Sequence, residues 1–319
     1  MTTYSHTVAL TADFAFNERI PEVRRQEIRN SISGLITQQI DANTRRRELA
    51  AEDRALATAL QEPYLDQLRN SPRGADALRL ATERSRTRTV DVRDLPREAA
   101  ENPSRHVPAG ALDYPFPPTR DFEGPPTRIF GVPYDFHWFW HDLNGSPAFN
   151  RIVDDANGRA ALDARVGNAS GATGTLVNAH AGYGVSLRSD RRVNCMARSY
   201  RSTQDFGAAA AGFDADATVE AGCEMTVMQA GNLIAIATDK RFRGRVSGSI
   251  GHPTENYGYD SGGFGPGAVI EVLWTMEANT DYELNVGGWV YAESHNGIGG
   301  AGAQSQIDAK IIFMSLWQQ

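Results

Sequence analysis

Apolar and polar side chains alternate between residues 4 and 16 of the chain. The positions between the apolar ones carry mainly Ser, Thr and Asp, and a period of two predicts a β-strand. The side chains on the apolar face are Tyr4, His6, Val8, Leu10, Ala12, Phe14 and Phe16. An unpaired strand promotes association, so we expect this one to join a sheet formed elsewhere in its own chain or in a neighbouring copy.

A helical period follows Pro21, a residue that suits the first turn of a helix. Apolar side chains at steps of three and four residues form one stripe. These are Val23, Ile28, Ile32, Leu35, Ile36 and Ile40. We expect a break or cap over residues 41–44, a second helical stretch over 45–61, a short third piece over 63–70 and a further turn or two over 76–84.

The second stretch places Leu49, Leu56 and Leu60 on one side of a helix. Narrow stripes of this kind are usually buried against copies of the same chain or against another domain. Together with the N-terminal strand, residues 1–81 therefore predict an oligomerisation region. Its expected contact residues are Val8, Leu10, Phe14, Phe16, Ile28, Ile32, Leu35 and Ile36.

The helical pattern ends near residue 82, and residues 82–128 are rich in Pro, Arg and small polar side chains. Proline prevents helix formation and is rare in central strands, so this segment is predicted to be an extended connector.

Beyond residue 129 the alternation returns in seven or eight runs separated by turn signals. Examples begin at Thr175, Val193, Val219, Ile270 and Ile307. The pattern predicts an antiparallel β-sandwich over residues 129–319, in a jelly-roll-like arrangement. The fold class of the whole chain is thus α+β and multidomain.

An aromatic box at residues 132–142 contains His137 and His141, four residues apart and flanked by acidic side chains. On a strand this spacing places two side chains on one face but too far apart to chelate a metal ion, and we expect none. The box is interpreted as an aromatic plug packed on the core or on a neighbour. Alternatively, its exposed rings form a sugar-stacking platform with Tyr134, Trp138 and Trp140.

Two Gly-rich stretches, residues 256–267 and 296–302, are interpreted as long loops of the sandwich. Binding surfaces are often built on such loops. Tyr257, Tyr259 and Phe264 in the first are expected to contact a partner or a glycan, with an ordinary loop folded over a sheet edge as the alternative.

Candidates for catalysis are few. Cys195 and Cys223 lie on the apolar faces of their strands, which favours buried free thiols, although a disulfide between them is an alternative. No G-x-S-x-G elbow occurs, and neither Gly-rich stretch lies between a strand and a helix as a phosphate loop would. We therefore predict a protein that is not an enzyme and has no cofactor, with a metal-dependent hydrolase as a remote alternative.

Composition narrows the class of partner. Acidic and basic residues balance up to residue 128, so the formal net charge of −7 resides in the rest of the 319-residue chain. Neither half is net basic, which argues against a nucleic-acid partner. Mean hydropathy is −0.42, and the sequence has no apolar run long enough to span a bilayer and no signal-peptide pattern at its start. We expect cytoplasmic synthesis, followed by incorporation into a particle or by non-classical export.

The run Pro133-Tyr134-Asp135-Phe136-His137-Trp138, the strands after it and the closing Leu316-Trp317 resemble a group of uncharacterised bacterial proteins. That group shares a P-Y-D-x-x-W box ahead of a β-sandwich ending near a Trp. The resemblance covers about residues 125–319 and implies a domain boundary, without any established activity.

These patterns favour a non-enzymatic structural or attachment protein, bacterial or from a phage, that self-assembles into a particle, filament or surface assembly. The alternative is a carbohydrate- or receptor-binding module of a toxin or exported effector.

Overall fold

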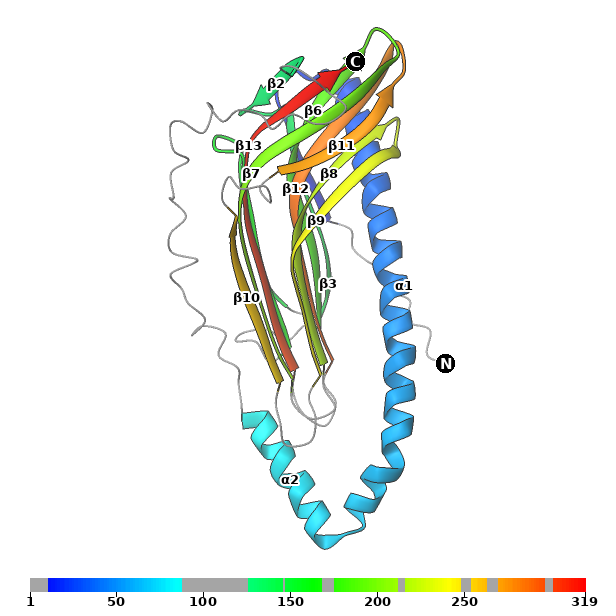
Figure 1. The fold of residues 1–319 in the computed structure, drawn as a ribbon, viewed down its shortest axis with the longest axis vertical. Helices are drawn as coiled ribbons and strands as arrows, with labels where there is room; N and C mark the ends of the chain where they lie inside the picture. The colour runs from blue at the N-terminus through cyan, green and yellow to red at the C-terminus, as the bar shows by residue number, and fades with distance from the viewer. Residues whose placement is uncertain are drawn as a thin grey trace.

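A computed structural model gives the architecture of the chain. It describes residues 11–87, 126–145, 147–167, 175–211, 216–247, 254–262, 269–295 and 301–319, with some residues of the helices and strands described by backbone alone. Two antiparallel sheets and an N-terminal helical region make up these residues (Figure 1). No helix among them combines the length and apolarity needed to cross a membrane.

Sheet A has six strands, and every neighbouring pair is antiparallel. In spatial order they are β1 (Thr11–Phe16), β3 (Phe136–Asn144), β6 (Leu176–Ser189), β12 (Thr280–His295), β8 (Asp216–Gln229) and β9 (Asn232–Ser247).

Sheet B has seven strands. Its main order is β10 (Thr254–Gly262), β7 (Val193–Ala211), β13 (Ala301–Gln318), β5 (Arg159–Gly167) and β4 (Ala148–Asp154). β11 (Val269–Met276) also pairs with β7, and β2 (Arg128–Gly131) pairs with β13.

The main hydrophobic core lies between the two sheets and confirms the period-two reading of the C-terminal strands. In β11, for example, Ile270, Val272, Trp274 and Met276 are buried while the residues between them are exposed. The result is a β-rich, sandwich-like body. Cys195 and Cys223 are both buried in its core, as the alternation predicted, and neither forms a disulfide.

The N-terminal strand finds its partner within its own chain. β1 pairs antiparallel with β3, so that Phe14 lies opposite Trp138 and Phe16 opposite Phe136. Of the two sequence alternatives, the pairing within one chain is the one observed. The part of the predicted strand before Thr11, including Val8 and Leu10, lies outside the described residues.

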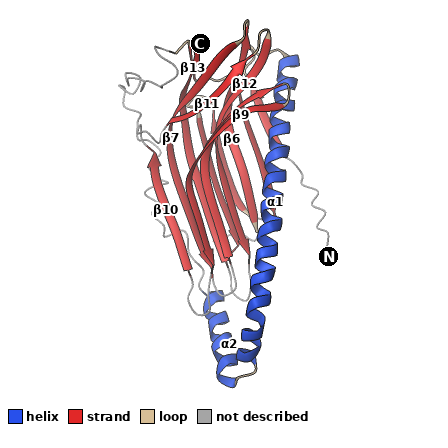
Figure 2. Ribbon diagram, turned by 45° about the vertical axis from the view of Figure 1, so that its right-hand side comes forward, coloured by secondary structure: helices blue, strands red, loops and turns tan. Residues whose placement is uncertain are grey.

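The helical region consists of α1 (Glu22–Arg69) and α2 (Pro72–Thr87). α1 runs alongside the sheets, and α2 folds back at the lower end of the molecule (Figure 2). The expected break over residues 41–44 and the separate piece after Pro63 are both wrong, because α1 continues through them. Within α1, the Arg47 guanidinium donates to the Thr44 hydroxyl at 3.2 Å. The helical turns expected over residues 76–84 are confirmed by α2, which begins earlier and ends later than expected.

Two further expectations from sequence need correction. Residues 254–262, expected largely as a loop, form β10 in a regular ladder with β7. The loop expected over 296–302 is shorter at its C-terminal end, because β13 begins at Ala301. Glycine frequency in these runs favoured loops, whereas pairing with a long neighbouring strand determines the structure.

Candidate functional site: helix α1 and the face of sheet A beneath it

Helix α1 covers the outer face of sheet A, and aromatic side chains form the apolar part of the contact. Ile28, Ile32 and Ile36 pack with Phe136, Trp138 and Trp140 of β3. Gly184 on the neighbouring strand β6 makes room for the Phe136 ring, since a Cβ there would lie 2.1 Å from its Cζ. The aromatic box and the helix stripe, far apart in sequence, are thus two sides of one interface.

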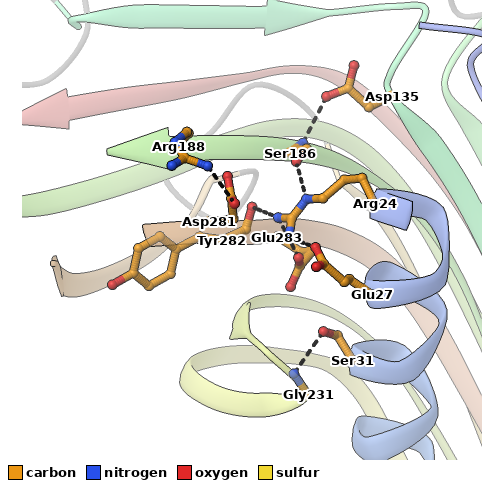
Figure 3. Close-up of polar contacts among 10 residues, drawn as sticks. All are labelled: Arg24, Glu27, Ser31, Asp135, Ser186, Arg188, Gly231, Asp281, Tyr282 and Glu283. Atoms are coloured by element: carbon orange, nitrogen blue, oxygen red, sulfur yellow. Dashed lines mark hydrogen bonds and ion pairs between the residues drawn. The ribbon is translucent and has the colours of Figure 1, made fainter. Parts of the chain in front are cut away.

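At the upper end of α1, Arg24 holds the helix to two strands of sheet A (Figure 3). Its guanidinium lies 2.6 Å from a carboxylate oxygen of Glu283, donates to the Ser186 hydroxyl at 3.0 Å and donates to the Tyr282 carbonyl at 3.2 Å. The Ser186 backbone N–H in turn donates to Asp135 at 2.8 Å. One arginine therefore fixes the register of the helix against β6 and β12.

Glu283 is fully buried beneath the helix. Burial raises the pKa of its carboxyl from 4.5 to about 7, because the charged form loses hydration, and the neighbouring Arg24 opposes this shift. Protonation of Glu283 is therefore linked to the contact between α1 and the sheet.

The helix also lies close to the turn between β8 and β9. The backbone N–H of Gly231 donates to the Ser31 hydroxyl at 3.0 Å (Figure 3). Gly34 faces the same turn, where a Cβ would lie only 2.8 Å from the Gly231 carbonyl oxygen. The glycine in the middle of α1 is thus explained by the closeness of this approach.

A second polar cluster lies below the aromatic contact and centres on His180. Its Nδ1 lies 2.8 Å from Glu224, whose other oxygen accepts a hydrogen bond from Gln39 of α1 at 2.9 Å. The imidazole stacks on Trp140, with ring centroids 4.4 Å apart, and also on Trp289. A histidine oriented by a carboxylate can act as a proton carrier, but here both groups are buried by the helix.

Two arginines of α1 complete this lower cluster. Arg46 donates to Glu220 at 3.0 Å and lies over the Tyr291 ring, 4.1 Å from its centroid, and Arg47 lies 3.8 Å from Asp142. Burial raises the pKa of the Tyr291 phenol. Cationic side chains of the helix therefore meet acidic side chains of the sheet at both ends of the apolar contact.

Several buried polar atoms on this face lack a hydrogen-bond partner within the described part of the chain. They are the indole nitrogens of Trp138 and Trp140 and side-chain atoms of Asn178, Thr226 and Asn285. Burying such groups costs free energy that an apolar face would not. The face of sheet A under α1 thus carries polar side chains of the kind found on solvent-exposed surfaces. The ion pairs and the apolar stripe of α1 hold the helix on this face.

Beyond Arg47, α1 carries a second apolar face that the described residues leave open. Leu49, Leu56, Leu60 and Tyr64 are 64, 63, 74 and 56% exposed. We call these four side chains the leucine stripe. Leu65 nearby is buried, so the stripe lies on the side of α1 away from the contact that covers Leu65.

The structure places three expected ligand-binding residues where a ligand cannot stack on them. Trp138 and Trp140 are buried under α1, and Tyr134 is buried with its hydroxyl donating to the Ile311 carbonyl at 3.1 Å. Their assignment to an exposed sugar platform is therefore corrected: the aromatic plug, packed on the chain's own helix, is the arrangement observed. Tyr257 and Tyr259 lie on strand β10 with side chains that are not described, and Phe264 lies outside the described residues.

The residues expected to form contacts between copies are instead buried in contacts within one chain. Ile28, Ile32, Leu35 and Ile36 are at most 1% exposed, and Phe14 and Phe16 pack against the aromatic cluster of the same interface. They therefore offer no free surface to a second copy in this arrangement.

Sequence reasoning missed Glu220, Glu224, Glu283 and His180. Glu220 and Glu224 occupy the polar parity of their strand, which indicates a solvent-facing side. No local pattern in the sequence indicates that a helix covers this side of the strand.

No three His, Cys, Asp or Glu side chains gather to hold a metal ion in the part of the chain that the structure describes. His137 and His141 both lie on β3, and His137 Nδ1 contacts Asp155 at 2.5 Å.

Comparison with known proteins adds no assignment: no family model matches the chain, and no curated protein matches it either. The resemblance carried by the Pro133–Trp138 box and the closing Leu316–Trp317 therefore stays a prediction.

Proposed function

We propose that this protein is a non-enzymatic structural or attachment protein that self-assembles, and that the leucine stripe of α1 is its contact with a further copy. The observation that carries the proposal is the exposure of the stripe. Three leucines and a tyrosine, spaced seven, four and four residues apart, form an exposed stripe on the lower part of a helix whose upper part is packed on sheet A.

The energetics favour a partner for this surface. Burying one leucine side chain is worth about 1.5–3 kcal/mol, and spacings of four and seven residues are those of a helix packed against another helix. The described sheets do not supply that partner, because their contacts with α1 are made higher on the helix, through residues such as Ile32 and Arg46, and leave the leucine stripe exposed.

The alternative function, a carbohydrate- or receptor-binding module, has less support. It relied on exposed aromatic side chains, and Tyr134, Trp138 and Trp140 are buried. Enzymatic activity has no supporting cluster among the described residues, where the one His–Glu pair with both side chains buried, His180 and Glu224, lies under α1.

The same proposal includes a jelly-roll-like arrangement of the two sheets and an oligomerisation region in the N-terminal helices, on the lower part of α1 that carries the leucine stripe. Support for the first is that successive strands from β6 to β8, and from β12 to β13, alternate between the sheets.

Paired leucine variants test the proposal. Leu56 and Leu273 are exposed to nearly the same extent, at 63 and 60%, but Leu273 lies on β11, away from the stripe. We expect Leu56→Glu to lower the native mass measured by light scattering, because a carboxylate would be desolvated in the contact, while Leu273→Glu leaves it unchanged. Circular dichroism checks that both variants fold. Equal masses for the two folded variants would contradict the proposal.

A further inference from the structure

The leucine stripe has the pattern of one strand of a two-helix coiled coil. Leu49 and Leu56 occupy equivalent positions one heptad apart, and Asp53 and Leu60 occupy the other core position of the same repeat. Asp53 is exposed in the single chain, and it is the one charged side chain inside the segment bounded by Leu49 and Leu60 on this seam. The position of Asp53 therefore determines whether the α1 helices of two copies can pair in parallel or only in antiparallel orientation.

A parallel, in-register pair of helices would bring Asp53 against Asp53 of the second copy. Two carboxylates facing each other in a contact that excludes water repel each other and lose hydration. An antiparallel pair centred near residue 55 instead places Asp53 opposite Leu56 of the second copy. Leu49 then lies opposite Leu60 of the second copy at both ends of the contact.

The charges flanking the stripe support the antiparallel arrangement. Arg45 and Asp66 lie on the same edge of the seam, one before Leu49 and the other after Leu60, and both are exposed. Antiparallel pairing brings Arg45 of each copy beside Asp66 of the other, whereas parallel pairing brings Arg45 beside Ala50 and Asp66 beside Ser71, past the end of α1. Two opposite-charge pairs therefore form in one orientation only.

We propose that two copies of this chain associate through an antiparallel pair of α1 helices, with Leu49 of each packed on Leu60 of the other and Arg45 of each beside Asp66 of the other. This inference rests on the proposed function and adds its geometry: a two-fold contact between identical surfaces. Such a contact closes on itself, so it forms a dimer, and any larger assembly is built from dimers through other surfaces.

Cysteine cross-linking in the full chain tests the orientation. In the antiparallel pair the two Leu49 positions are about 16 Å apart along the axis, too far for a disulfide. We therefore expect Leu49→Cys alone to give no cross-linked dimer on oxidation, and an equimolar mixture of Leu49→Cys and Leu60→Cys chains to give one. The native Cys195 and Cys223 are buried, and burial raises the pKa of the Cys195 thiol to about 11, so they form little background.

A mixture of Leu49→Cys and Leu273→Cys chains is the matched control for random collision and is expected to remain uncross-linked. Dimers from Leu49→Cys alone would overturn the antiparallel geometry in favour of a parallel one. If neither sample cross-links while light scattering still gives a dimer or larger mass, the geometry is overturned and self-assembly survives. If the mass is that of a monomer, both fail.

Discussion

Three buried glutamates, Glu220, Glu224 and Glu283, lie on the face of sheet A that α1 covers. Each contacts α1: Glu220 contacts Arg46, Glu224 contacts Gln39, and Glu283 contacts Arg24. A buried ion pair adds little net stability, but removing one partner leaves a charge without compensation. These residues thus specify where along the sheet the helix sits more than they add to the free energy of unfolding.

Glu283 makes this contact dependent on pH. Its pKa in the folded chain, about 7, exceeds the ordinary value of 4.5 because the carboxyl is buried. The stability linked to its proton is therefore fully present below pH 4.5 and is lost as the pH rises through about 7, by on the order of 3 kcal/mol. Glu283→Gln should flatten the dependence of the free energy of unfolding on pH across this window.

Denaturant unfolding at a series of pH values measures this effect. Glu277→Gln is the matched control, because the Glu277 side chain is 54% exposed. Its carboxylate forms a surface ion pair with Arg192, in which Oε1 lies 3.3 Å from the arginine Nε. If Glu283→Gln retains the slope of the unmodified protein, the account of this carboxyl is wrong.

Helix α1 packs on sheet A of its own chain through Ile28, Ile32 and Ile36. The contribution of this packing to stability can be measured separately from self-assembly. Ile32 is fully buried, so Ile32→Ala should lower the free energy of unfolding by about 2–5 kcal/mol, through lost burial and a cavity at the aromatic cluster. Val23→Ala on the same helix, at a position 75% exposed, should change it by less than about 0.5 kcal/mol. Equal effects of the two changes in denaturant titrations would contradict the packing of α1 on sheet A.

The individual helices and strands were largely predictable from the sequence, but the segments with which they pair and pack were not. Local periods gave the N-terminal strand, the buried stripe of α1 and the alternation of β11, since each depends on one face meeting an apolar layer. The pairing of Phe14 with Trp138 joins segments more than a hundred residues apart, and no local pattern encodes it.

The candidate site was the least predictable part for a related reason. Glu224 and Asn285 alternate with buried apolar neighbours, as side chains of a solvated face do. They are buried only because a helix from the other end of the chain covers them. The continuity of α1 through Pro63 was missed because proline lowers helix propensity locally, whereas 48 residues of helix outweigh one lost hydrogen bond.

For the whole molecule, the upper and lower halves of α1 have separate tasks in this account. The upper half, up to Arg47, fixes the helix on the sheet, and the leucine stripe below it faces outward with its apolar side chains exposed. The chain carries a formal net charge of −7, so copies repel one another at long range, and association requires a short-range apolar contact of this kind.

The native mass of the unmodified full chain, measured by light scattering at micromolar concentration in physiological salt, tests self-assembly most directly. The account predicts a dimer or a multiple of it. A monodisperse monomer of 34.8 kDa would contradict the account and leave the leucine stripe without a second copy as its partner.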